Sequence, residues 1–396
     1  MPYNESHLGR SGSLAIVLLP IMVAVFTAFL AIGLALPVLP LHVHNGLGLG
    51  GFAVGIVAGG QFAASLVSRV WAGGFADARG GKNAVTLGLV GATVAGLLYL
   101  LSLTLLSSPT ASVTALLLGR AILGGAESFI ITGAVSWGLI IGGPANTGKV
   151  IAWIGTAMYA AFAVGAPLGG SLYEAYGFIA IAITTAAIPF VTLAIVLPQA
   201  SLTSHAPQKA PMVSVLGAIW LPGVGLAMSS LGFGAMMTFA SLLFAERGWT
   251  PVWLGVSAFA VSFILARIFF GHITDKLGGA RVALACLAIE AIGLAMIWLA
   301  STEVIAFAGA VLTGFGYSLV YPGFGVEAVQ RAPAKAKGLA MGTYTAFLDL
   351  ALGVSSPILG LLAGKAGTGR VFLVSSVVVA AASLIAIRLR ATPSST

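Results

Sequence analysis

Three charged residues lie deep inside apolar segments of the chain. Arg120 and Glu127 are seven residues apart in segment 112–140, and Asp349 lies in segment 338–363. On a helix, a spacing of seven places two side chains on one face, about 10 Å apart along the axis. Charged groups at such depth are costly, usually face a cavity and mark ion or substrate pathways. The pattern predicts proton, cation or substrate binding; the alternatives are an arginine–carboxylate pair that only holds helices together and, for Asp349, a buried hydrogen bond.

The segments that carry these residues have the composition of membrane helices. Hydrophobic residues make up 59% of the 396 residues and charged residues 7%, and the mean hydropathy is +1.08. A membrane helix needs about 20 apolar residues. The chain is predicted to be an all-α polytopic membrane protein with twelve transmembrane helices, at 14–39, 51–74, 84–106, 112–140, 147–173, 177–197, 215–244, 252–271, 282–301, 304–328, 338–363 and 370–388.

A polar, glycine-rich pattern occurs twice, 198 positions apart, which is half of the chain length. The repeated pairs are Arg69/Arg267, Gly73/Gly271, Asp77/Asp275, Gly80/Gly278 and Gly81/Gly279. A fixed long period indicates one structural unit used twice, and duplicated halves are typical of two-bundle transporters. We therefore predict two pseudo-symmetric six-helix bundles, 1–197 and 215–396, joined by a polar cytoplasmic linker, 198–214.

Lysine and arginine distribution predicts the orientation. With the N-terminus inside, twelve of these residues fall in cytoplasmic loops and tails, and only Arg247, Lys365 and Arg370 fall outside. By the positive-inside rule, both termini are expected on the cytoplasmic side of a bacterial inner membrane. The formal charge of +8 therefore reflects topology, and no nucleic-acid partner is expected.

The motif that begins at Gly73 resembles the loop motif of the major facilitator superfamily, here Gly73-x-x-x-Asp77-x-x-Gly80-Gly81-Lys82. The twelve spans, the linker and the second copy agree with it, so the resemblance covers nearly the whole chain and points to the bacterial drug- or sugar-efflux branch, similar to arabinose efflux permeases. The resemblance implies that Asp77 lies near helix eleven and closes the cytoplasmic side. The alternative is a polar turn without a gating role. The implied gating residues are Arg69, Gly73, Asp77, Gly80, Lys82, Arg267, Gly271, Asp275, Gly278 and Arg281.

Two further motifs resemble parts of the same superfamily. Arg120 and Gly124 match the R-x-x-x-G motif of its proton-coupled members. A glycine–proline pattern in span five is similar to the motif of its exporters, although one residue rather than two separates the proline from the glycine pair; ordinary packing of small residues is the alternative. Its residues are Gly165, Pro167, Gly169 and Gly170, with a loose echo at Pro357. The resemblance also places Asp349 on a helix that flanks the cavity.

Aromatic residues near these charges are candidates for substrate contact, because ligand sites are mostly apolar and a ring face binds cations. The candidates are Trp137, Trp153, Tyr159, Tyr317, Tyr321 and Tyr344. The alternative is an anchoring role at the membrane interface. Of the remaining carboxylates, Glu327 is expected to contact Arg331 or a loop, and Glu290 to have a structural partner.

No cofactor or metal is expected. The segment 143–150 resembles a P-loop, but Val150 replaces the residue that would hold Mg²⁺. His42 and His44 have no further clustered ligands in the sequence.

The resemblance and the buried charges together predict a monomeric secondary transporter, not an enzyme. It is expected to export a small organic solute, drug-like, sugar or amino-acid-like, by proton-coupled antiport with alternating access. Its expected partners are a small organic solute, protons and the lipid bilayer. In this hypothesis Glu127 and Asp349 carry the proton or cation, and Arg120 modulates them or contacts an anion. The alternatives are a proton symporter that imports its solute, and a receptor or scaffold without transport.

Overall fold

The computed structural model of the protein describes residues 11–143, 146–202, 212–333 and 337–392. Its first half contains α1 (Ser11–Ala35), α2 (Leu39–Leu41), the π-helical turn η2 (His42–Gly46), α3 (Gly51–Arg79), α4 (Gly81–Thr104), α5 (Pro109–Gly142), α6 (Thr147–Tyr176) and α7 (Phe178–Val196). The second half contains α8 (Met212–Glu246), α9 (Leu254–Phe270), α10 (Ile273–Leu277), α11 (Gly279–Leu299), α12 (Glu303–Arg331), α13 (Lys337–Ala366) and α14 (Thr368–Ala391).

The all-helical prediction is confirmed, and each of the twelve predicted segments falls on a helix. Within the described ranges, eleven helices are long and apolar enough to cross a membrane, the first of them running through α1, α2 and η2 from Ile16 to Gly46. The twelfth, α9, is a shorter apolar helix of 17 residues. The chain is a multi-pass membrane protein.

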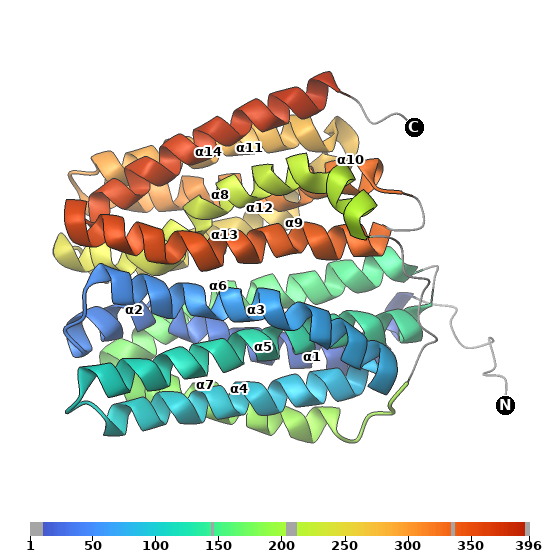
Figure 1. Ribbon diagram of the computed structural model, residues 1–396, viewed down its shortest axis with the longest axis horizontal. Coiled ribbons are helices and arrows are strands. Elements are labelled where there is room, and N and C mark those ends of the chain that lie inside the picture. The colour runs from blue at the N-terminus through green and yellow to red at the C-terminus, as the bar shows by residue number, and fades with distance from the viewer. Residues whose placement is uncertain (1–10, 144–145, 203–211, 334–336, 393–396) are drawn as a thin grey trace.

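The helices form two groups that lie side by side (Figure 1). Helices α1–α7 occupy the lower part of the view and α8–α14 the upper part. Contact between the groups runs mainly through α3 against α13 and α6 against α9. The boundary at 198–214 stays a prediction, because residues 203–211 of that segment lie outside the described part of the chain.

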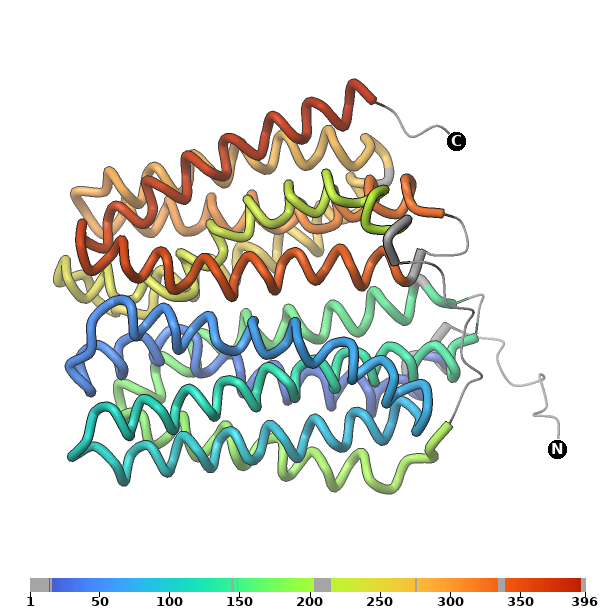
Figure 2. Tube along the Cα trace, viewed as in Figure 1, coloured from blue at the N-terminus to red at the C-terminus, as the bar shows by residue number. Residues whose placement is uncertain are grey.

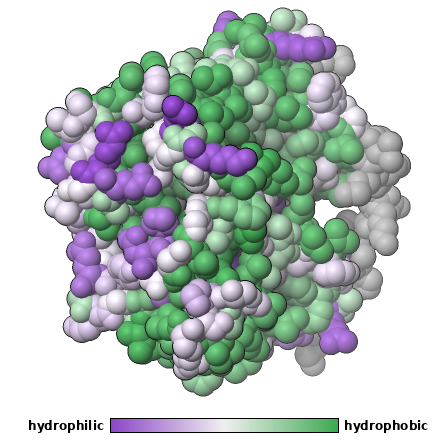
Figure 3. Space-filling view, turned by 60° about the vertical axis from the view of Figure 1, so that its left-hand side comes forward, coloured by the Kyte–Doolittle hydropathy of each residue, from purple (hydrophilic) through white to green (hydrophobic). Residues whose placement is uncertain are grey.

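The ends of the first and last helices and the apolar surface suit a membrane-spanning arrangement. Helix α1 begins and α14 ends at the same end of the molecule (Figure 2). Hydrophobic residues cover much of the surface seen in Figure 3, and hydrophilic residues gather where the opposite end comes forward. Large apolar side chains such as Val70, Trp71 and Phe190 are more than half exposed, which suits contact with lipid.

Small residues set the helix spacing. A Cβ added to Gly96 of α4 would lie 2.2 Å from the backbone nitrogen of Ala186 in α7. At Gly124 of α5 it would lie 1.9 Å from the carbonyl oxygen of Gln61 in α3. Backbones this close pack well in lipid, where hydrophobic burial supplies little driving force between helices.

We expect Gly96→Ala to lower the melting temperature of the detergent-solubilised protein. The added methyl group overlaps the α7 backbone, and overpacking of this kind costs about 1–3 kcal/mol. Gly155→Ala is the matched control, because its methyl group would meet no atom within 4 Å and alanine favours a helix. Equal melting temperatures for the two variants in tryptophan-fluorescence unfolding would contradict the close α4–α7 contact.

Candidate functional site

One face of α3 carries a row of polar side chains. Gln61, Ser65 and Arg69 are spaced four residues apart, so they lie one above the other on the helix. Ser128 of α5 donates a hydrogen bond from Oγ to the carbonyl oxygen of Ser65 at 2.7 Å, and the two hydroxyl oxygens are 3.0 Å apart. This row brings the polar side chains of α3 and α5 together. Gln61 and Ser65 were not predicted as site residues, although their spacing of four from Arg69 carries the signal, and Ser128 was not predicted either.

Glu127 joins this row one residue before Ser128. Gln61 donates from Nε2 to Glu127 Oε2 at 2.7 Å. The Glu127 side chain is partly exposed, and among the described residues no cation forms an ion pair with it. Within the described ranges, its side-chain hydrogen-bond donor is therefore neutral.

Asp349 of α13 meets the same row from the other helix group. Arg69 donates from Nε to Asp349 Oδ2 at 3.0 Å and forms an ion pair with it through Nη2. Ser65 Oγ donates to the same oxygen at 3.5 Å. Asp349 is 2% exposed, so its charge is neutralised inside the bundle by an arginine from the opposite half. Arg69 and Asp349 thus join the two halves directly.

Arg120 lies elsewhere on α5 and pairs with no carboxylate among the described residues. It is 1% exposed, and it donates from Nε to the Val57 carbonyl at 3.2 Å and from Nη2 to the Ala58 carbonyl at 3.4 Å. Its Nη1 atom has no partner in the described structure. The Arg120–carboxylate pair considered as a structural alternative is thus not formed, and Arg120 attaches α5 to the backbone of α3.

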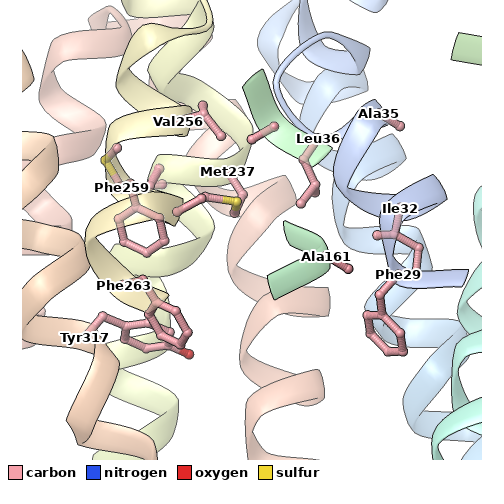
Figure 4. Packing of buried hydrophobic residues seen from close by; sticks show 14 of the residues in the cluster. Phe29, Ile32, Ala35, Leu36, Ala161, Met237, Val256, Phe259, Phe263 and Tyr317 are labelled. Atoms are coloured by element: carbon pink, nitrogen blue, oxygen red, sulfur yellow. The ribbon is translucent and has the colours of Figure 1, made fainter. Parts of the chain in front are cut away.

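Aromatic rings meet at the interface between the halves: Tyr159 comes from α6 of the first half and the others from the second half. The ring centroids of Tyr159 and Phe263 are 4.8 Å apart, those of Phe263 and Tyr317 5.9 Å, and those of Phe233 and Tyr317 5.2 Å. Figure 4 shows Phe263 beside Tyr317, with Phe259 above them. The Arg267 guanidinium lies 4.5 Å from the Tyr159 ring centroid. We call Tyr159, Phe233, Phe259, Phe263 and Tyr317 the ring wall.

Repeated contacts show which positions of the two halves correspond. Ser318 donates from Oγ to the Phe263 carbonyl at 2.8 Å, as Ser128 does to Ser65. A Cβ added to Gly314 would lie 2.3 Å from the Phe259 carbonyl oxygen, the counterpart of the Gly124–Gln61 contact.

By this correspondence, Gln61, Ser65 and Glu127 in the first half match Phe259, Phe263 and Tyr317 in the second. We call the first three residues, together with Asp349, the polar wall. Polar side chains in the first half are thus replaced by aromatic rings in the second.

Of the other predicted aromatic residues, two lie at the junction of α12 and α13. Tyr321 Oη lies 2.8 Å from Thr345 Oγ1, and Tyr344 Oη donates to the Tyr321 carbonyl at 2.8 Å. Trp137 packs against Gly81 in the first half. Among the described residues, neither Trp137 nor Trp153 makes a ring contact with the ring wall, so the structure does not bring them to this site.

The gating motif is mostly helical rather than a loop. Helix α3 continues through Gly73 and Asp77 to Arg79, and the turn occurs at Gly80, where φ is 90°. In the second copy α9 ends at Phe270, Gly271 has helical torsion angles, and the matching turn is at Gly278 with φ of 87°. Both angles are in the region that only glycine adopts readily.

The motif's charged residues are placed as follows. Asp77 is exposed and forms no ion pair within the described ranges, and Lys82 donates from Nζ to the Leu197 carbonyl at 2.7 Å. The side chain of Asp275 lies outside the described residues. Arg281 lines a cavity inside the second half. Arg69 and Arg267 reach the opposite half, whereas gating by Asp77 stays a prediction.

The glycine–proline motif lies at close helix contacts. A Cβ added to Gly165 would lie 2.9 Å from Gly33 Cα, and one added to Gly169 would lie 2.0 Å from the Leu34 carbonyl oxygen. At Gly170 it would lie 2.1 Å from Cγ of Trp253, a residue of the other half. Pro167 is within α6 and Pro357 within α13, where Pro357 faces Gly59 of α3.

The two other carboxylates considered in the sequence, Glu327 and Glu290, have the kind of partner expected. Glu327 pairs with Arg331 and accepts a hydrogen bond from the Ala280 backbone at 2.9 Å. Glu290 is fully buried and accepts a hydrogen bond from Ser229 Oγ at 2.7 Å.

The family model described as Major Facilitator Superfamily matches residues 21–278 and 223–396 of the chain. The protein called uncharacterized MFS-type transporter YhhS of Escherichia coli strain K12 is 38% identical over 93% of this chain and 91% of its own length. An uncharacterized MFS-type transporter of Pseudomonas aeruginosa strain LESB58 is 39% identical over 88% of this chain and 87% of its own length.

Solved structures agree on the fold. A bacterial homolog of the human lysosomal transporter Spinster, in an inward-facing and occupied conformation, matches with a TM-score of 0.75 at 13% identity, over 97% of this chain and 98% of that one. The fucose:proton symporter of Escherichia coli matches with a TM-score of 0.65 at 13% identity, over 95% and 99% of the two chains.

We expect Arg69→Gln and Asp349→Asn to be strongly coupled in stability. Each single variant leaves one charge without its partner, whereas the double variant removes both, so a double-mutant cycle should give an interaction energy of about 0.5–3 kcal/mol. Thermal unfolding in detergent measures it. The control cycle Glu303→Gln with Arg370→Gln, two exposed residues, should be additive. Additivity of the Arg69–Asp349 cycle would refute a stabilising pair between the halves.

Proposed function

Because the chain belongs to the major facilitator superfamily, and is a transporter and not an enzyme, we propose that it exports a small organic cation in exchange for protons. The observation that carries this proposal is the pair of walls: polar side chains of the first half, with Glu127 among them, and rings at the corresponding positions of the second half. In alternating access, two such halves rock around a site near the bilayer midplane.

The charge balance of the polar wall supports exchange. Arg69 already neutralises Asp349, so Glu127 is the carboxyl that needs a positive partner. An unpaired carboxylate in a low-dielectric interior is strongly unfavourable. Glu127 therefore holds either a proton, as a carboxylic acid, or the positive charge of the solute. Solute binding releases the proton from the Glu127 oxygen to water, and solute release on the other side lets Glu127 take up another.

The ring wall supports the choice of solute. A cation near the face of an aromatic ring is attracted to it, and large rings provide apolar contact area. Because Phe263 and Tyr317 correspond in position to Ser65 and Glu127, our proposal has one solute, with a charged group and an apolar body, contact both walls. A sugar would leave the rings without a charged partner.

The driving force follows from this stoichiometry. Exchange of one proton for one monovalent cation moves no net charge, so the membrane potential does not drive it. A difference of one pH unit across the membrane then sustains a solute gradient of about tenfold, since a tenfold ratio corresponds to about 1.4 kcal/mol.

The two repeated arginines have different roles in the proposed cycle. Arg69 holds the two halves together through its ion pair with Asp349, which a proton on Asp349 would weaken. Arg267 lies over the neutral ring of Tyr159. In our proposal the Arg69–Asp349 contact opens during the cycle and the Arg267–Tyr159 contact persists.

We place the transporter in the bacterial inner membrane as a monomer with both termini in the cytoplasm. The lysine and arginine distribution supports this orientation, and the similar proteins come from bacteria.

The experiment is solute exchange in proteoliposomes with an imposed pH gradient and an internal pH dye. We expect an aromatic monovalent cation to move against protons at a rate independent of membrane potential, and an uncharged analogue and a sugar not to move. Glu127→Gln should abolish exchange, because the amide carries no exchangeable charge, whereas Glu303→Gln, an exposed carboxylate elsewhere, should retain it.

The other outcomes separate the alternatives. Movement of solute and protons in the same direction would establish a symporter, and binding without flux a receptor or scaffold. Normal proton-coupled exchange in Glu127→Gln would overturn the assignment of the proton to this residue.

A second measurement tests the ring wall. We expect Phe263→Leu to weaken binding of the aromatic cation by roughly two- to fivefold, since a cation–ring contact contributes about 0.5–1 kcal/mol. Phe315→Leu is the control, because Phe315 pairs with Phe270, outside the ring wall. Isothermal titration with the detergent-solubilised protein gives both dissociation constants. Equal weakening in the two variants would remove the ring wall from the proposed site.

A further inference from the structure

A cavity separate from the two walls lies within the second half. It has a volume of about 620 Å³, within the range of roughly 300–1,000 Å³ typical of small-molecule sites. It lies between α10, α11, α12 and the last turns of α14, at the end of the molecule where α14 terminates (Figure 1). Its lining comes only from the second half, so it is distinct from the proposed transport site.

The charge in this cavity is unbalanced. Its one lining carboxylate, Glu327, is already engaged by Arg331 and by the Ala280 backbone. Arg281 and Arg390 also line it. Both are exposed, and within the described ranges neither side chain has a hydrogen bond or an ion pair with another residue. Two free guanidinium groups thus remain beside a neutralised carboxylate.

The surroundings of these arginines are apolar. Leu277 is 56% exposed and Ile387 50% exposed, and both line the cavity. A soluble anion would contact only the guanidinium groups. A phospholipid would contact both the guanidinium groups and the exposed apolar side chains. Its phosphate suits the planar donors of arginine, and its acyl chains suit the exposed apolar side chains. Basic pockets between membrane helices bind anionic headgroups for these reasons.

We propose that this cavity binds the headgroup of an anionic phospholipid, with Arg281 and Arg390 holding the phosphate. Bound there, the lipid connects the start of α11 to the end of α14. The site does not depend on the proposed transport function.

The test is native mass spectrometry of the detergent-solubilised full chain, titrated with phosphatidylglycerol and with phosphatidylcholine of the same acyl chains. We expect phosphatidylglycerol to bind more tightly. The double variant Arg281→Gln/Arg390→Gln should lose roughly 30-fold in its affinity, since each arginine near an anionic lipid contributes about 1 kcal/mol. Lys365→Gln/Arg370→Gln removes the same charge from exposed positions at the other end of the second half and should bind as the wild type does.

Three results would overturn the proposal. They are equal affinity for the two lipids, equal loss in the two double variants, and binding of inorganic phosphate as tight as that of the lipid, which would make the cavity a site for soluble anions. If the double variant does not fold, Arg390→Gln alone, in the last turn of α14, should still lose several-fold against Arg370→Gln.

Discussion

The contact between Arg69 and Asp349 is the interaction on which the arrangement of the two halves depends. A buried carboxylate in an apolar bundle is stable only with a partner, and here the partner comes from the opposite half. Ser65 binds the same carboxylate and also contacts Ser128. Ser128 follows Glu127 in α5, so the ion pair, the serine pair and the free carboxyl group form one connected row. A change of charge in this row therefore acts directly on the contact between the halves.

The duplicated architecture has kept its packing and changed its chemistry. Both copies retain the glycine at the α3–α5 and α9–α12 contacts and the serine that bonds the neighbouring backbone. These residues act on the backbone and leave the adjacent side chains free to vary. At those adjacent positions the first copy has Gln61 and Glu127, and the second has Phe259 and Tyr317. The same scaffold thus supports polar side chains in one half and aromatic rings at the corresponding positions of the other.

Much of the fold and part of the site could be predicted from the sequence. Hydropathy located all twelve helices, because a membrane helix must satisfy its backbone internally over a fixed length. Buried charge singled out Glu127 and Asp349, since such residues are rare in membrane segments. The partners of these residues could not be predicted. Arg69 was assigned to the gate and Arg120 placed near Glu127, because sequence spacing gives positions along one helix and not the rotation of one helix against another.

The two contacts between the halves respond differently to a change of charge. Attraction between Arg69 and Asp349 depends on the charge of a carboxyl group, and protonation removes most of it. The contact of Arg267 with the Tyr159 ring involves a neutral partner and does not change with a proton on the polar wall. A proton on Asp349 would therefore weaken the contact through α13, whereas the contact through α6 would hold. In the proposed transporter this asymmetry turns a local change of charge into rotation of one half against the other.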